Sequence, residues 1–117
     1  YAWDELAALR LLGAVDVLQP DVTRCGGVKS ALRIDALARA RSLPTSLHCA
    51  PAVSAHVGAA METLRHLEYF HDHVRLEALL FDGVPELDGV GDLVPRADRP
   101  GLGLELRRAE AERFRVR

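Results

Sequence analysis

The chain has 117 residues, of which 49% are hydrophobic and 27% are charged, and its formal net charge is −2. This length and composition fit one small globular domain rather than a disordered chain or a multi-domain machine. No apolar stretch approaches the roughly 18 residues that a membrane span needs. Basic residues form no patch, so we expect neither a membrane nor a nucleic-acid partner. The chain begins at Tyr1 and its only methionine is Met61, so we expect a piece of a longer protein.

Both cysteines are expected to be structural. Cys25 and Cys49 fit neither a disulfide framework nor a zinc-binding pattern, which predicts a reduced, cytoplasmic setting. Cys49 directly follows His48, and adjacent residues of a strand point to opposite faces. We therefore expect these two side chains not to form a nucleophilic pair, and we expect Cys25 to pack as a small hydrophobic residue.

Helical and strand-like segments alternate along the first two thirds of the chain. Apolar residues at helical spacing predict helices over 4–12, 28–42 and 53–64. Short apolar runs between breaks predict strands over 14–18, 45–49 and 66–70. This alternation predicts an α/β fold of parallel strands with crossover helices, and both a doubly wound sheet and a (β/α) barrel satisfy it.

The pattern changes beyond Val74. Glycine and proline interrupt the chain every few residues, so we predict an irregular tail with short turns. A final helix is predicted from Arg108, where arginines alternate with glutamates as on a solvent-exposed helical face with ion pairs.

An ionisable residue stands at or near the end of each predicted strand: Asp21, His48 and Glu68. Sites form at the carboxyl ends of parallel strands, so these side chains are expected to meet at one mouth. A carboxylate beside an imidazole orients it and stabilises its protonated form, which suits a general acid or base. A second carboxyl group can donate a hydrogen bond to developing negative charge. The alternatives are a turn residue, a buried structural histidine and a solvated glutamate.

Four segments carry a resemblance to one enzyme family. Val-Leu-Gln-Pro-Asp at 17–21, followed by Arg-Cys-Gly-Gly-Val at 24–28, resembles the sixth-strand motif of the mandelate racemase branch of the enolase superfamily. Ser-Leu-His at 46–48, followed by Ser-Ala-His at 54–56, is similar to its seventh strand and following helix. Leu-Glu-Tyr at 67–69 resembles its eighth strand, and the segment 98–104 resembles its Pro-Gly-Leu-Gly stretch. The match runs in order along nearly the whole chain.

The resemblance implies a fold and a set of roles. Residues 1–73 would be about the last three β/α units of a modified TIM barrel, and 74–117 a tail that packs toward a capping domain. His48 would remove or return the proton alpha to a substrate carboxylate, and Asp21 would orient and charge-stabilise His48. Glu68 would bind the substrate by a hydrogen bond to a carboxylate oxygen as the enolate forms.

The resemblance also implies a reaction class. Dehydration of a sugar acid is the first expectation, and racemisation or epimerisation of a 2-hydroxy acid is the alternative. The family's Mg²⁺ ligands and its second base, a lysine, stand on strands that the chain lacks, so we expect no metal ligand in it. The full-length enzyme would require Mg²⁺, act on a small carboxylate and form a homo-oligomer, whereas the chain alone would be nearly inactive.

Other interpretations remain open from the residues themselves. The chain could be a non-catalytic fragment that assembles with a partner chain through unpaired strand edges, or a phosphate-binding half-barrel. Gly26 and Gly27 could cradle a phosphate or serve the loop. Arg24 could contact an anionic substrate or form a surface ion pair. His71 and His73 could bind a metal as i, i+2 residues of a strand, although a solvated turn is the simpler interpretation.

Overall fold

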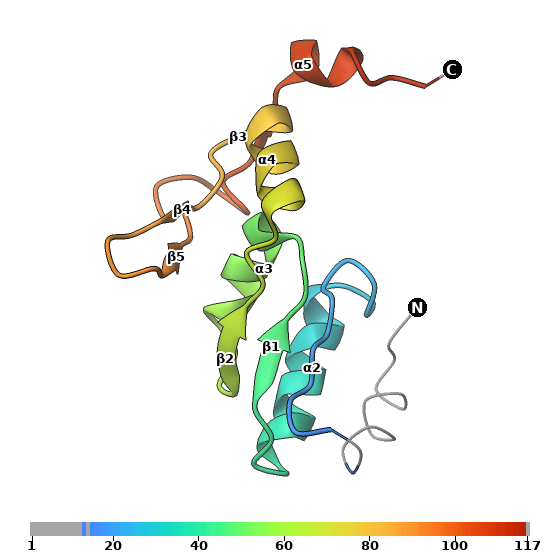
Figure 1. The fold of residues 1–117 in the computed structure, drawn as a ribbon, viewed down its shortest axis with the longest axis vertical. Helices are drawn as coiled ribbons and strands as arrows, with labels where there is room; N and C mark the ends of the chain where they lie inside the picture. The colour runs from blue at the N-terminus through green and yellow to red at the C-terminus, as the bar shows by residue number, and fades with distance from the viewer. Residues whose placement is uncertain (1–12, 14, 117) are drawn as a thin grey trace.

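Two short parallel strands lie beside helices in one half of the computed structural model, which describes residue 13 and residues 15–116 (Figure 1). Strand β1 (Thr45–Leu47) pairs with β2 (Leu64–Leu67), and Leu18 adds a single parallel bridge to Thr45 on the other side of β1. The predicted parallel strands joined by crossover helices are therefore confirmed. The helix predicted over 4–12 lies outside the described residues.

The segment predicted as the first strand pairs with β1 only from its last residue onward. The Ser46 N–H donates to the Leu18 carbonyl at 2.7 Å, and the His48 N–H donates to the Pro20 carbonyl at 3.0 Å. Residues 15–17 are not a strand, and the side chain of Val15 is exposed. That part of the prediction was wrong, because an extended run becomes a strand only where a partner lies beside it, and no described residue pairs with 15–17.

Two helices that contact each other pack against the sheet and build the core together with it. Helix α2 (Val28–Arg39) buries a stripe of Ala31, Ile34 and Ala38, as its apolar spacing predicts. It ends three residues before the predicted boundary, and Ser42 then takes a left-handed conformation with φ 53°. The buried hydrophobic cluster joins this stripe to the sheet and to the turn after Asp21; its members are Leu18, Val22, Cys25, Ala31, Ile34, Ala38, Leu47 and Val57.

Helix α3 (Pro51–Gly58) is shorter than the predicted helix over 53–64 because a buried carboxylate draws the chain out of it. Asp35, 5% exposed on α2, accepts the N–H groups of Glu62 and Thr63 at 2.9 and 3.0 Å, and also the Thr63 hydroxyl. These N–H groups are thereby lost to helical bonding, and the chain turns into β2. Asp35 therefore fixes where β2 starts, and with it the strand that leads to Glu68.

The tail contains more regular structure than the sequence predicted. Helix α4 (His71–Leu80) follows β2, so the prediction of an irregular chain from Val74 was wrong for 74–80. No glycine or proline interrupts this segment. The helix was missed because it buries no residue completely, so its apolar residues form only a weak stripe at helical spacing. Two small antiparallel pairs and a last helix complete the chain: β3 (Phe81–Asp82) with β6 (Glu105–Leu106), β4 (Glu86–Leu87) with β5 (Leu93–Val94), and α5 (Arg108–Glu112).

The tail is held to the end of α4 by close contacts around β3. Gly83 has φ 83°, and a Cβ atom there would lie 2.1 Å from the Gly103 carbonyl oxygen. Arg99 forms an ion pair with Asp82 at 2.6 Å. Figure 1 shows the β4–β5 hairpin to one side of β2 and α5 at the far end of α4. None of the helices in this described part of the chain is long and apolar enough to cross a membrane.

Candidate active site

Backbone pairing brings the three predicted site residues to one edge of the sheet. The His48 N–H bonds to Pro20, directly before Asp21, and the Glu68 N–H donates to the Leu47 carbonyl at 2.8 Å, directly before His48. The backbone hydrogen bonds on both sides of β1 therefore end at the same position along this strand. Asp21, His48 and Glu68 follow these ends and lie side by side, as the strand-end argument predicts.

The imidazole of His48 lies between the two carboxyl groups. Asp21 Oδ2 is 3.3 Å from His48 Nδ1, and Glu68 Oε2 is 3.6 Å from His48 Nε2. The His48 side chain is 42% exposed, whereas that of Asp21 is 10% exposed. The ring is thus fixed at its inner nitrogen and reachable at its outer edge, which is the arrangement a base needs to meet a substrate.

Asp21 is anchored by the residue two positions later. Its Oδ1 accepts the Thr23 N–H at 2.8 Å and the Thr23 hydroxyl at 2.7 Å. Burial alone would raise the pKa of Asp21, but the hydrogen bonds from Thr23 and His48 outweigh burial and hold this pKa below its usual value. Asp21 is therefore ionised at neutral pH and favours the His48 tautomer with its proton on Nδ1, which leaves Nε2 unprotonated.

Cys49 joins this cluster, contrary to the expectation that strand geometry separates it from His48. Cys49 and Ala50 adopt left-handed conformations, with φ 53° and 44°, which are costly for residues other than glycine. β1 has already ended, so the alternation of strand side chains no longer applies. The turn places Cys49 Sγ 3.5 Å from His48 Nε2 and 3.4 Å from Glu68 Oε2.

The thiol of Cys49 is not activated as a nucleophile. Burial and the neighbouring Glu68 carboxylate raise the pKa of Cys49 to about 11, so the thiol keeps its proton at neutral pH. Sequence reasoning missed both Cys49 and Thr23 as members of the site. The Asp-x-Thr spacing is a signal for Thr23, since such pairs close local turns, whereas the turn at Cys49 has no glycine to mark it.

The remaining residues that the sequence singled out have structural roles. Gly26 and Gly27 have φ 100° and 86° and form the tight turn into α2, which fits the loop interpretation. Arg24 is a largely exposed side chain whose Nε lies 3.7 Å from Asp21 Oδ2, which fits the surface ion pair. Cys25 is 2% exposed within the core cluster, as predicted.

His71 and His73 do not form a two-histidine metal site. They lie in the first turn of α4 and not on a strand, so residues two positions apart point in different directions. His73 Nδ1 accepts the Ala50 N–H at 3.2 Å, which helps hold the turn after Cys49, while His71 is exposed. Both interpretations of these residues, the strand with a metal site and the solvated turn, were wrong because the residues begin helix α4.

The donor atoms at the described strand edge do not suit Mg²⁺. Magnesium takes oxygen ligands in octahedral geometry, whereas this cluster mixes one imidazole and one thiol with its carboxylates. Any magnesium ligands therefore have to come from outside this cluster.

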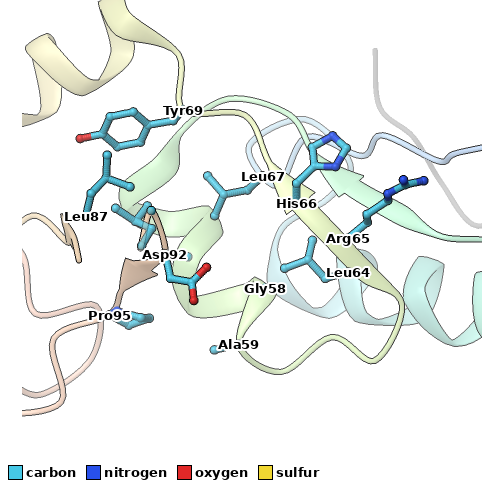
Figure 2. A pocket seen from close by; sticks show the side chains of 13 residues that line it. Gly58, Ala59, Leu64, Arg65, His66, Leu67, Tyr69, Leu87, Asp92 and Pro95 are labelled. Atoms are coloured by element: carbon cyan, nitrogen blue, oxygen red, sulfur yellow. The ribbon is translucent and has the colours of Figure 1, made fainter. Parts of the chain in front are cut away.

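A cavity of ≈ 340 Å³ lies beside β2 and away from His48. Figure 2 shows it between β2 and the β4–β5 hairpin, with Leu67 and Leu87 on its wall and the Asp92 carboxylate pointing into it. Neither Asp21, His48 nor Glu68 lines this cavity. The candidate site is therefore the open edge of the sheet and not this cavity.

Comparison with known proteins shows which family the chain belongs to. A family model described as enolase C-terminal domain-like matches residues 1–111. The chain belongs to this family. A crystal structure of a mandelate racemase/muconate lactonizing enzyme-like protein from Rubrobacter xylanophilus is 57% identical to it, with a TM-score of 0.91 over 97% of the chain. The predicted fold class, the C-terminal part of an enolase-type barrel domain, is confirmed.

Two further relatives of this enolase-like chain are enzymes of the same superfamily. The D-gluconate dehydratase of Thermoproteus tenax is 34% identical over 89% of the chain. An enolase from Bradyrhizobium, solved in complex with magnesium and mandelic acid, is 26% identical with a TM-score of 0.84 over 98% of the chain. The chain spans 22% of the dehydratase, 31% of the Rubrobacter protein and 30% of the Bradyrhizobium enolase.

Proposed function

We propose that the chain supplies the general-base part of an active site that removes the proton alpha to a carboxylate. The observation that carries this proposal is the His48 ring held between Asp21 and Glu68, with 3.3 Å at Nδ1 and 3.6 Å at Nε2. Membership of the enolase C-terminal domain-like family supports it. Because the chain spans less than a third of its relatives, the activity belongs to a longer protein that contains it.

The three side chains divide the work. His48 Nε2 accepts the proton, because the Nδ1 proton is committed to Asp21. The ionised Asp21 stabilises the imidazolium that results. Glu68 Oε2 already accepts the N–H and S–H groups of Cys49, so its other oxygen is the one left to share a hydrogen bond with a substrate carboxylate oxygen as negative charge develops. Magnesium, named for the Bradyrhizobium relative, would be held outside this cluster.

A sugar acid is the substrate class that we favour. Dehydration removes the alpha proton and the neighbouring hydroxyl group, and a histidine that has just gained a proton can return it to the departing hydroxyl as water. The 34% identity to a D-gluconate dehydratase supports this choice. Racemisation or epimerisation of a 2-hydroxy acid is the second candidate, favoured by the mandelic acid bound to the Bradyrhizobium enolase.

A substrate panel tests the proposal. The protein, with any residues that its gene encodes before Tyr1, is incubated with magnesium and a set of aldonic and aldaric acids, and products are followed by NMR. We expect loss of water to a 2-keto-3-deoxy acid in the wild type and no product in His48→Asn. His66→Asn, which removes an exposed histidine of β2, is the matched control and keeps activity. Conversion by His48→Asn at the wild-type rate would contradict the proposal.

A further inference from the structure

Three different donor atoms converge on one point beside the catalytic edge. The distances are 3.5 Å between His48 Nε2 and Cys49 Sγ, 3.6 Å between His48 Nε2 and Glu68 Oε2, and 3.4 Å between Cys49 Sγ and Glu68 Oε2. The three atoms form an almost equilateral triangle. The centre of this triangle lies about 2.0 Å from each atom, so an ion slightly above its plane would make the 2.0–2.3 Å bonds that zinc forms with nitrogen, oxygen and sulfur.

We propose that His48, Cys49 and Glu68 bind a borderline-soft divalent cation, zinc being the best fit. One imidazole, one thiolate and one carboxylate are zinc ligands, and ligands of a tetrahedral zinc ion stand about 3.4–3.6 Å apart, as these atoms do. The His48 and Glu68 side chains are 42% and 37% exposed, so the ion can enter and a water molecule can take the fourth position.

The surrounding contacts hold the ligands in place without an ion. Asp21 lies on Nδ1 of the same His48 ring, which gives the carboxylate–histidine–metal arrangement that orients a ligating imidazole. The Cys49 N–H donates to Glu68 Oε2 at 3.2 Å, and the Ser54 hydroxyl donates to the Cys49 carbonyl at 2.8 Å. The left-handed turn at Cys49 is thereby fixed from both sides.

An ion at this point competes with proton abstraction for one atom. Nε2 carries the lone pair that accepts the substrate proton, so bound zinc displaces the thiol proton of Cys49 to solvent and occupies the base. Zinc would then inhibit the enzyme at concentrations that leave its fold intact. This consequence rests on the proposed function, whereas zinc binding itself does not.

Cobalt replaces zinc as a coloured probe in the test. Co²⁺ is titrated into the purified protein, and thiolate coordination is read from the sulfur-to-cobalt charge-transfer absorption, with competition by Zn²⁺. We expect the band in the wild type and in Cys25→Ala, the matched cysteine control, and no band in Cys49→Ser. Absence of the band in the wild type, or its persistence in Cys49→Ser, would overturn the proposal.

Two further variants keep the turn cysteine and guard against misfolding of Cys49→Ser. Glu68→Gln removes the carboxylate ligand, and Asp21→Asn removes the group that orients His48. Each should weaken cobalt binding by about 10- to 100-fold, while Mg²⁺ should not displace cobalt. Unchanged affinity in both variants would show that the metal sits elsewhere. Because none of these measurements uses turnover, their failure is distinguishable from failure of the proposed enzymatic function.

Discussion

Replacing Asp21 with asparagine should reverse the proton position on the His48 ring while keeping the fold. Asp21 Oδ1 accepts two donors from Thr23, so the asparagine must place its carbonyl oxygen there to keep both bonds. Its NH₂ group then faces His48 Nδ1, which lies 3.3 Å from the present Oδ2. An amide NH₂ group can only donate, so Nδ1 must accept and the ring proton moves to Nε2.

The size of the effect follows from two losses. The hydrogen bond from the imidazolium to a carboxylate is worth about 1.5–3 kcal/mol, which corresponds to about 10- to 150-fold in rate. The second loss arises because the proton on Nε2 blocks the lone pair that would accept the substrate proton. The two losses together should lower the rate about 10²- to 10⁴-fold. The free energy of unfolding should fall by only about 1 kcal/mol, because both Thr23 bonds survive.

Long-range ¹H–¹⁵N NMR correlation of the ring nitrogens measures the tautomer directly, at a pH where the ring is neutral. The wild type should carry its proton on Nδ1 of His48 and Asp21→Asn should carry it on Nε2, while the exposed Asp16→Asn serves as control. A proton that stays on Nδ1 in Asp21→Asn would refute the reasoning. So would a rate in the whole protein within threefold of the wild type.

Three further outcomes are expected. Asp35→Asn should lower the free energy of unfolding in urea by about 2–4 kcal/mol. The amide keeps only one oxygen, so one of the two loop N–H groups before β2 loses its acceptor. A change below 0.5 kcal/mol, on the order of a surface substitution, would contradict this. Gly83→Ala should lower the melting temperature, because its Cβ would clash with the Gly103 carbonyl, whereas Gly89→Ala, which meets nothing within 4 Å, should not. The folded-state pKa of Asp21 is lowered, so its contribution is complete above the usual value of 3.8 and is lost as pH falls through the lowered value. The loss of unfolding free energy below about pH 4 should therefore be shallower in Asp21→Asn, as measured by urea unfolding across this range.

The convergence of Asp21, His48 and Glu68 is easier to predict from the sequence than the elements around them. Parallel strands end at one level, so three strand ends suffice to bring Asp21, His48 and Glu68 together. The position of Cys49 could not be predicted, because two later residues hold its left-handed turn. Glu68 lies 19 positions further along the chain, and Ser54 lies five positions further, beyond the turn. The early end of α3 likewise depends on Asp35, a contact between residues 27 and 28 positions apart.

Exchange of the alpha proton with solvent tests the central claim most directly, because it reports proton abstraction whether the product is dehydrated or racemised. The whole protein is incubated with a sugar acid in deuterated water, and deuterium at the alpha carbon is followed by NMR in the wild type, His48→Asn and His66→Asn. If His48 is the base, exchange of an alpha proton that faces His48 occurs in the wild type and in His66→Asn and disappears in His48→Asn. Exchange that continues undiminished in His48→Asn would contradict the assignment of His48 as the base.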